Sequence, residues 1–309
     1  YTLPRFGINT TFVDFRKTAE IKKNIKKNTK LIFGETLGNP GLDVLNIPKV
    51  SKIAHDNNMP LLVDSTFTTP YLMKPFELGA DLIFHSATKF LSGHGVVIGG
   101  LLVDGGQFDW NSSTKFKTLT EPYEGFHDMN FVDEFGPAAY INRARKEGAR
   151  DFGACMSPHT AFLVLQGMET LNLRMERHIK NTRSIVDFLN THASVKSVCY
   201  PELKSHLDYD LAKDILPNGC GAVFTFQLEG NKETGTKFIE QLNLFSHLAN
   251  VGDAKSLVIH PASTTHHRMN NAALKKAGIT ESTIRLSIGI EDSEDLIEDL
   301  DEALTYATR

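Results

Sequence analysis

Cysteine is scarce in this sequence: the 309 residues include three, Cys155, Cys199 and Cys220. The three are far apart in the chain, no two of them form a CxxC pair, and none stands at a zinc-ligand spacing from a histidine. A disulfide framework or a structural zinc site is therefore not expected. Unpaired thiols of this kind favour a reducing compartment such as the cytoplasm.

Long apolar runs and an excess of positive charge are also absent. No run approaches the roughly 20 apolar residues that cross a bilayer, and no secretory signal is visible. The formal net charge is −4, which argues against a nucleic-acid or anionic-membrane partner. One basic cluster, Lys22–Lys27, is interpreted as the solvated face of a surface helix rather than as a phosphate or nucleic-acid patch.

What the chain does contain is the composition of a globular protein, with 41% hydrophobic and 23% charged residues. That composition and length suffice for a sizeable core in one or two domains. The chain begins at Tyr1 without Met and soon enters a predicted strand, Phe6–Val13. We therefore expect that an N-terminal segment is missing from this sequence; a native start after removal of Met is the alternative.

Short apolar runs alternate with helical patterns in the first part of the chain. Helices are predicted at Arg16–Lys27 and Ile47–Asn58, and strands at Leu31–Glu35, Leu61–Ser65, Leu82–Ser86 and Val96–Val103. Alternation of this kind indicates βαβ units and a mostly parallel sheet. In such sheets ligands bind beyond the carboxyl ends of the strands.

The rest of the chain has a different pattern. Residues 105–150 are rich in small and polar residues with scattered aromatics, which indicates an ordered insertion because the aromatics would otherwise be exposed. The apolar pattern over Pro158–His192 predicts a long helix that bridges two domains. Later strands are predicted at Val195–Tyr200, Ala222–Leu228, Ser256–His260 and Ile284–Ile290, with helices at Tyr209–Leu216, Lys232–Leu242, Arg268–Ala277 and Ser293–Ala307. We expect a large α/β domain over residues 1–190 and a smaller C-terminal α+β domain over residues 191–309.

Two neighbouring predicted strands end in groups that suit one cofactor. Asp64 follows the apolar residues 61–63, and Ser86, Thr88 and Lys89 end the next run. If the two strands are parallel, these groups share one edge of the sheet. A carboxylate for a ring nitrogen, hydroxyls for a phosphate and an amine for an aldehyde are what pyridoxal 5′-phosphate (PLP) requires.

Each of these residues also has an ordinary structural interpretation. Lys89 alone would be a surface residue, and Asp64, Ser86 and Thr88 would be cap or turn residues. The small residues Ser92–Gly95 after the lysine disfavour the surface interpretation, because a Gly-rich turn permits close approach of a ligand to the backbone.

Five segments, in order along the chain, resemble one enzyme family. They are FGETLGNP at Phe33–Pro40, VDSTF at Val63–Phe67, SATKF at Ser86–Phe90, LQGMETL at Leu165–Leu171 and IRLSIGIE at Ile284–Glu291. Together they are similar to the Cys/Met-metabolism family of PLP enzymes, and the match extends over nearly the whole chain. The insertion and the run Met168–His178 resemble the branch of that family that sulfhydrylates O-acetylhomoserine.

The resemblance implies a fold, a cofactor and a set of contacts. The fold would be the aspartate aminotransferase-like, fold type I arrangement of PLP-dependent transferases. Lys89 would hold the cofactor aldehyde and later carry protons. The other implied cofactor contacts are Asp64 to the ring nitrogen, Ser86 and Thr88 to the phosphate, Asn39 to the phenolic oxygen, and Glu35 near the same end of the site. The implied substrate contacts are Arg285, Ser256 and Asn39, with Arg285 gripping the α-carboxylate in a two-pronged pair.

Alternatives remain open for several of these residues. Asn39 begins a good turn signal without any ligand, Glu35 suits a helix cap or a lysine pair, and Arg285 suits a solvent-facing strand position. No metal site is predicted, because His266 and His267 are adjacent and point apart in most backbones. Ordinary polar roles, or contacts that support the site residues, suit these two histidines, His94 and His260 better.

The implied reaction is γ-replacement, in which sulfide displaces acetate from O-acetyl-L-homoserine to give L-homocysteine in methionine biosynthesis. Cystathionine γ-synthase and methionine or cystathionine γ-lyase are alternatives within the family, and a non-catalytic binding subunit is an alternative of another class. A nucleotide-binding protein is disfavoured because GxGxxG and GxxxxGK[ST] motifs are absent. The resemblance also implies a homotetramer with sites shared across a dimer, and leaves the sulfur donor open between free sulfide and a sulfur-carrier protein.

Overall fold

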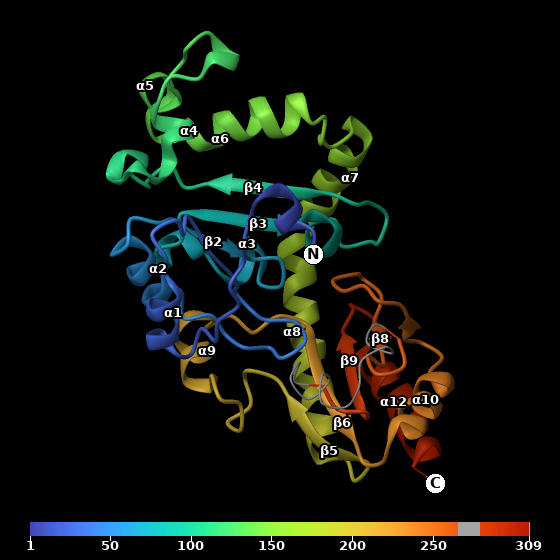
Figure 1. Cartoon of the computed structure of the whole chain (residues 1–309). Coiled ribbons are helices and arrows are strands. Elements are labelled where there is room, and N and C mark those ends of the chain that lie inside the picture. Colours follow the sequence, from blue (N-terminus) through green and yellow to red (C-terminus); the bar gives the residue numbers. More distant parts are fainter. Residues whose placement is uncertain (265–278, 309) are drawn as a thin grey trace.

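The computed structural model describes residues 1–264 and 279–308, and within that part of the chain the strands form two sheets (Figure 1). The first sheet has the order β1-β2-β3-β4. Strands β1, β2 and β3 run parallel, and β4 runs antiparallel to β3. The expected mostly parallel sheet is confirmed, with an antiparallel strand at its edge. The strand bounds are β1 (Ile32–Glu35), β2 (Leu61–Asp64), β3 (Leu82–Ser86) and β4 (Gly100–Asp104).

The second sheet belongs to the C-terminal part of the chain and has the order β5-β6-β9-β8-β7. Its pairs are antiparallel except for β7 with β8. The strands are β5 (Val195–Cys199), β6 (Val223–Leu228), β7 (Ser246–His247), β8 (Leu257–Ile259) and β9 (Thr283–Ser287). Helices α10 (Lys232–Gln241) and α12 (Ser293–Ala307) pack side by side against this sheet (Figure 1). The expected α+β character of this region is therefore present.

The helices around the first sheet follow local sequence rules. Helix α2 (Ile47–His55) begins where the Asn46 side chain accepts a hydrogen bond from the backbone N–H of Lys49, and Pro48 lies in its first turn. Its buried face follows the helical period. The other helices here are α1 (Thr18–Asn24), α3 (Thr69–Leu72) and, from the C-terminal part, α9 (Tyr209–Ile215).

The predicted long helix is in fact two helices. Helix α7 (Pro158–Glu169), capped by the Ser157 side chain, ends before Thr170, and α8 (Leu171–Thr191) runs on between the two sheets (Figure 1). The break brings Gly167 so near the backbone of Ser92 that an added Cβ would lie 2.2 Å from its carbonyl oxygen. Neither α8 nor any other helix in the described residues is long and apolar enough to cross a membrane.

Two sequence predictions at the first sheet are wrong. Phe6–Val13 forms no strand: the chain there makes a short 3₁₀ helix, η1 (Leu3–Phe6), and then an irregular segment with Phe12 91% exposed. An apolar run becomes a strand only when it has a partner to bond with, and this run has none in the described residues. Strand β4 also starts at Gly100 instead of Val96. The predicted helix Arg268–Ala277, and His266 and His267, lie outside the described residues.

The insertion over residues 105–150 is ordered around its own aromatic cluster. Trp110 and Phe131 are buried there, and the Trp110 ring stacks on Tyr140 with centroids 5.2 Å apart. The guanidinium carbon of Arg143 lies 4.3 Å from the centroid of the Tyr123 ring. The aromatic residues that the sequence scatters along this stretch therefore make a second, smaller core, which also includes Leu82 of β3. Its helices include α4 (Lys117–Thr120), α5 (Phe131–Phe135), α6 (Ala139–Arg143) and the π-helical η8 (Ala144–Asp151).

A single hydrophobic cluster extends from the first sheet through α8 into the second sheet. Val63 on β2, Met175 on α8 and Phe224 on β6 are all fully buried members of it. The division of the chain at residues 190 and 191 stays a prediction, because this core is shared by both parts.

The carboxylate of Asp208, just before α9, joins three segments of the chain. It accepts hydrogen bonds from Arg16 Nε at 3.0 Å and Nη2 at 2.6 Å, and from the backbone N–H of Val44 at 2.9 Å. Arg16 Nη2 also lies 2.6 Å from Asp43 Oδ1. These contacts fix the loop after β1, in which Asn39 lies.

Replacing Asp208 by alanine is expected to lower the free energy of unfolding at neutral pH by about 2–3 kcal/mol, because charge-assisted bonds are lost and the Val44 N–H loses its acceptor. Burial alone would raise the pKa of Asp208, but Arg16 and the Val44 N–H bring it below its ordinary value. A lowered folded-state pKa gives stability that is present above the unfolded pKa, about 3.9, and is lost as the pH falls through the folded pKa. Denaturant melts should therefore show that the difference in free energy of unfolding between the parent and Asp208→Ala becomes smaller below about pH 4. The control is Asp43→Ala, whose side chain is 60% exposed and which should cost less than about 1 kcal/mol; equal costs would contradict the assignment.

Candidate active site

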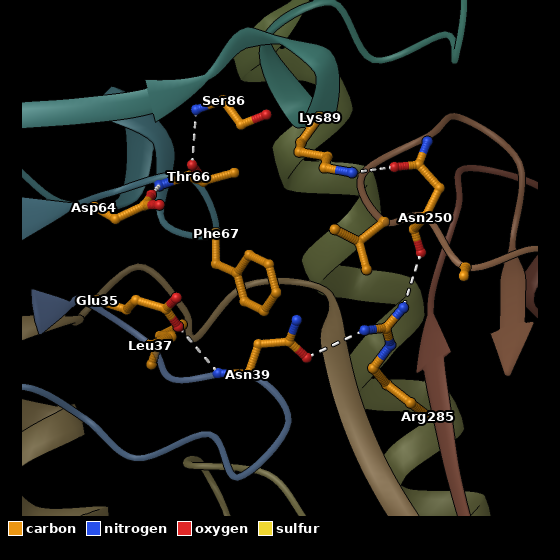
Figure 2. A pocket seen from close by; sticks show the side chains of 12 residues that line it. Glu35, Leu37, Asn39, Asp64, Thr66, Phe67, Ser86, Lys89, Asn250 and Arg285 are labelled. Carbon is orange, nitrogen blue, oxygen red and sulfur yellow. Dashed lines mark hydrogen bonds between the residues drawn. The ribbon is translucent and has the colours of Figure 1, made fainter. Parts of the chain in front are cut away.

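A cavity of ≈ 210 Å³ lies at the carboxyl ends of β1, β2 and β3 (Figure 2). Glu35, Asp64 and Ser86 line it, because each is the last residue of one of these parallel strands. Glu35 and Asp64 are register partners in the sheet. The expectation that these strand ends share one edge is met, and Asn39, Lys89 and Arg285 line the same cavity.

Lys89 lies in η3 (Ala87–Leu91), a tight π-type turn that directly follows β3. Its half-buried side chain enters the cavity, where Nζ donates a hydrogen bond to Oδ1 of Asn250 (Figure 2). Burial and the nearby positive charge of Arg285 lower the pKa of Lys89. A lower pKa leaves more of the amine neutral at pH 7, and the neutral amine is the form that attacks carbonyl groups and accepts protons.

Arg174, on helix α8, holds this turn in place through hydrogen bonds. Arg174 is buried and donates hydrogen bonds to the carbonyl oxygens of Phe90 at 2.9 Å and of Gly167 at 2.6 Å. Its guanidinium therefore ties the turn that carries Lys89 to the junction of α7 and α8. Thr66 ties the ends of β2 and β3 in a similar way: its N–H donates to Asp64 Oδ1 at 2.9 Å, and its hydroxyl accepts from the Ser86 N–H at 2.8 Å.

Arg285 reaches the cavity from β9, in the second sheet. Its Nη1 donates to Asn39 Oδ1 at 3.1 Å and its Nη2 donates to the backbone oxygen of Asn250 at 3.2 Å. Burial lowers the pKa of Arg285 to about 10, so the guanidinium stays charged at neutral pH. Arg285 thus lies inside the cavity instead of facing bulk solvent, with the geometry that suits a carboxylate.

Asn39 and Glu35 occupy the loop side of the cavity. The backbone N–H of Asn39 donates to Glu35 Oε2 at 3.2 Å. Partial burial and the negative charge of Asp64 raise the pKa of Glu35. A line of hydrogen bonds therefore runs from Glu35 through Asn39, Arg285 and Asn250 to Lys89, and it links the two sheets (Figure 2).

Two residues of the predicted site do not line the cavity. The Thr88 hydroxyl accepts from the Gly99 N–H at 3.0 Å and lies 3.3 Å from the Gly99 carbonyl oxygen. Ser256 is buried and donates to the Glu291 carboxylate through its N–H at 2.6 Å and its hydroxyl at 3.0 Å. The roles of Thr88 toward a phosphate and of Ser256 toward a carboxylate stay predictions.

Asn250, Thr66 and Phe67 also line the cavity and were not among the residues predicted from the sequence. Thr66 and Phe67 lie in the VDSTF segment, so the motif itself indicated them. Asn250 lies in a loop before β8, between the small residue Ala249 and Gly252. The sequence identifies Asn250 only as a loop residue, and it is the fold that brings this loop to the cavity.

The groups around the cavity fit PLP. Asp64, Ser86 and Lys89 supply a carboxylate, a hydroxyl and an amine to one space, and these match a pyridinium nitrogen, a phosphate and an aldehyde. Arg285 adds a cation suited to a substrate carboxylate. Among the described residues, no three His, Cys, Asp or Glu side chains gather in a way that could hold a metal ion.

Comparison with known proteins agrees with this chemistry. The family model described as "Cys/Met metabolism PLP-dependent enzyme" matches residues 1–305. The chain is 45% identical to the O-acetyl-L-homoserine sulfhydrylase of Leptospira meyeri, over 98% of this chain and 71% of that protein. It is 44% identical to the homocysteine synthase of Schizosaccharomyces pombe, over 99% of this chain and 72% of that protein.

A solved structure gives the same result in three dimensions. The crystal structure of a Campylobacter jejuni protein described as an O-acetylhomoserine (thiol)-lyase superposes with a TM-score of 0.94 at 38% identity. The similarity covers 99% of this chain and 73% of that one. That structure contains a pyridoxyl-lysine monophosphate, which is a lysine joined to the cofactor.

Proposed function

The chain belongs to the Cys/Met-metabolism family of PLP-dependent enzymes, and from that premise we propose that it catalyses the γ-replacement of O-acetyl-L-homoserine by sulfide. The products are L-homocysteine and acetate, and the pathway is methionine biosynthesis. The observation that carries this proposal is the meeting of the Lys89 amine and the Arg285 guanidinium in one cavity beside Asp64.

PLP, when bound, supplies an electron sink for negative charge that develops at the substrate Cα. Asp64 provides the negative charge that keeps a ring nitrogen protonated, and Ser86 provides a hydroxyl for the phosphate. Lys89 would hold the cofactor, and its amine would then move protons at the substrate Cα and Cβ. Its lowered pKa suits this work, because an acid–base group is most effective near the working pH.

Arg285 orients the substrate by holding its α-carboxylate. The two guanidinium nitrogens that now contact Asn39 and Asn250 are the ones available for a two-pronged pair. In the reaction the Cγ–O bond breaks, acetate leaves, and a Cγ–S bond forms with sulfide. The proton that Lys89 removes from Cα is returned before the product leaves, so the overall change is exchange of acetate for a thiol.

The test of this proposal is a steady-state assay of the chain loaded with PLP. O-acetylhomoserine with sulfide should give homocysteine, whereas cystathionine or methionine alone should give little product. Preference for cystathionine or methionine would favour a γ-lyase, and cysteine as the better acceptor would favour cystathionine γ-synthase. Absence of any turnover with cofactor bound would favour a non-catalytic subunit. Parallel assays with succinyl and phosphoryl esters, and with a protein thiocarboxylate in place of sulfide, identify the leaving group and the sulfur donor.

We also propose that copies of the chain form a homotetramer whose sites are completed across a dimer. Helix α7 and the segment before β4 expose large apolar side chains: Ile98 is 89% exposed, Leu165 61% and Phe162 56%. Apolar surface of this kind is typical of a protein interface. The double variant Ile98→Asp, Leu165→Asp should therefore run as a smaller species than the parent in size-exclusion chromatography with light scattering. Unchanged mass in the double variant would contradict the assignment of this surface.

We place the reaction in the cytoplasm. Cys155, Cys199 and Cys220 are free thiols, and a reducing compartment keeps thiols in that state.

A further inference from the structure

Asn250 lies between the two cations of the cavity and contacts both (Figure 2). Its side-chain Oδ1 accepts a hydrogen bond from Lys89 Nζ, and its backbone oxygen accepts one from Arg285 Nη2 at 3.2 Å. We propose that Asn250 is a positioning residue that aims the Lys89 amine at the substrate carbon held by Arg285. This inference rests on the proposed function and adds to it a residue that neither the sequence motifs nor the predicted site included.

The loop that carries Asn250 is fixed against β9 and against the segment Phe90–Gly93 that follows Lys89. Two residues further on, the Gly252 N–H donates to Ser287 Oγ of β9 at 2.9 Å, and the Ala254 N–H donates to the Gly93 carbonyl at 2.8 Å. Gly252 has a φ of +75°, and a Cβ there would lie 2.7 Å from the backbone nitrogen of Phe90. Glycine is required at this position because the loop packs directly on the turn that carries Lys89. Asn250 is thus held at a set place relative to both cations.

A fixed acceptor matters because a lysine side chain is flexible. The amine sits on a four-carbon stem with many rotamers, and one hydrogen bond to a rigid amide oxygen selects among them. Selection of one rotamer also sets the direction of the remaining N–H bonds or lone pair. A misplacement of about 1 Å in such a group costs on the order of 10²-fold in rate.

The Asn250 side chain carries no charge, and this affects the amine that it contacts. An amide oxygen accepts from the amine without adding a negative charge, so the lowered pKa of Lys89 is kept. An aspartate at this position would favour the ammonium form, whereas a leucine of similar shape would remove the acceptor. Other charged groups also face this turn or its cavity. They are Glu35, Asp64 and Arg285 in the cavity, Arg174 from α8 and Asp253 from the Asn250 loop.

The first measurement is capture of added PLP by the chain as a function of pH. Capture needs the neutral Lys89 amine, and borohydride reduction followed by mass spectrometry of the Lys89 peptide measures it without any turnover. Asn250→Leu should move the midpoint of the capture rate to lower pH, and Asn250→Asp should move it about one unit or more to higher pH. The matched control is Asn39→Asp, which places the same charge in the same cavity in contact with Arg285 instead of Lys89, and which should move the midpoint less. Leu and Asp variants that shift in the same direction, or not at all, would overturn the proposal.

The second measurement separates kcat from KM. Asn250→Leu should lower kcat for homocysteine formation about 10–100-fold. KM should stay within about threefold of the parent value, because Arg285 bonds to the backbone oxygen of residue 250 and the substitution keeps that oxygen. Asn250→Gln, which keeps an amide acceptor, should retain more of kcat than the leucine variant. A rise in KM at constant kcat would overturn the positioning role. Failure of the proposed function would appear differently, as a parent chain that captures PLP but forms no homocysteine.

Discussion

Replacing Lys89 by alanine is expected to lower the rate of homocysteine formation by about 10⁴-fold or more and to abolish covalent capture of PLP. General acid–base catalysis by one side chain typically contributes 10²–10⁴-fold, and in the proposed mechanism Lys89 also holds the cofactor. The Lys89 amine lines the same cavity as Asp64 and Arg285, and its pKa is lowered by burial and by Arg285. Loss of this one amine therefore removes both the group that binds the cofactor covalently and the group that carries protons.

Two readouts and two controls make this prediction specific. Turnover is measured with O-acetylhomoserine and sulfide, and capture by mass after borohydride reduction. Lys89→Arg keeps a positive charge but cannot form the covalent link, so it should be as inactive as the alanine variant. Lys52→Ala removes a lysine whose side chain is 75% exposed and should leave both readouts unchanged. An alanine variant at position 89 that retained activity within tenfold of the parent would refute the assignment, provided that its thermal melt matches that of the parent.

Much of the first sheet was predictable because its information is local. Strands β2 and β3 are short apolar runs that end in polar residues, and helix α2 has its own cap at Asn46 and a proline in its first turn. Parallel pairing then follows from the alternation of strands and helices. This pairing places Glu35, Asp64 and Ser86 at one edge of the sheet. Their grouping can therefore be predicted without information about long-range contacts.

The errors occur where distant parts of the chain decide the outcome. Phe6–Val13 has the residue types of a strand but no strand to pair with in the described residues. The helix predicted from Pro158 breaks at Thr170, where Arg174 and Gly167 pack against the backbone around Ser92. No periodicity in the helix itself could reveal that contact.

The difference between local and long-range contacts also decides which site residues can be predicted from the sequence. Asp64 is the last residue of β2 and Lys89 lies in the turn that follows β3, so their positions relative to one another depend on one sheet. Asn250 reaches the cavity only because its loop is bonded to β9 and packed on Phe90. Ser256 lies six residues further along, yet its N–H and hydroxyl are held by Glu291. Which residue of this loop lines the cavity depends on packing between the two sheets, and composition carries no signal for it.

Replacing Arg285 by leucine is expected to lower kcat/KM for O-acetylhomoserine by about 10²–10³-fold. Removing one partner of a buried, hydrogen-bonded charge pair costs about 2–5 kcal/mol, and the guanidinium remains charged at neutral pH because burial lowers its pKa only to about 10. Arg285→Lys should recover part of the loss and no more, since an ammonium is a point charge that cannot reproduce the two-pronged pair. Steady-state kinetics of the three proteins at neutral pH give the comparison.

A substrate without the carboxylate tests whether this loss arises from the proposed contact. 3-Aminopropyl acetate has the amine and the acetyl ester of O-acetylhomoserine but lacks its α-carboxylate. The parent should use this compound far less well than O-acetylhomoserine, and the Arg285→Leu variant should discriminate between the two about 10²-fold less than the parent does. Because removal of the carboxylate changes the intrinsic reactivity equally for both proteins, the ratio isolates the interaction between Arg285 and the carboxylate. Equal discrimination by parent and variant would show that another group binds the carboxylate and that Arg285 acts only through its bonds to Asn39 and Asn250.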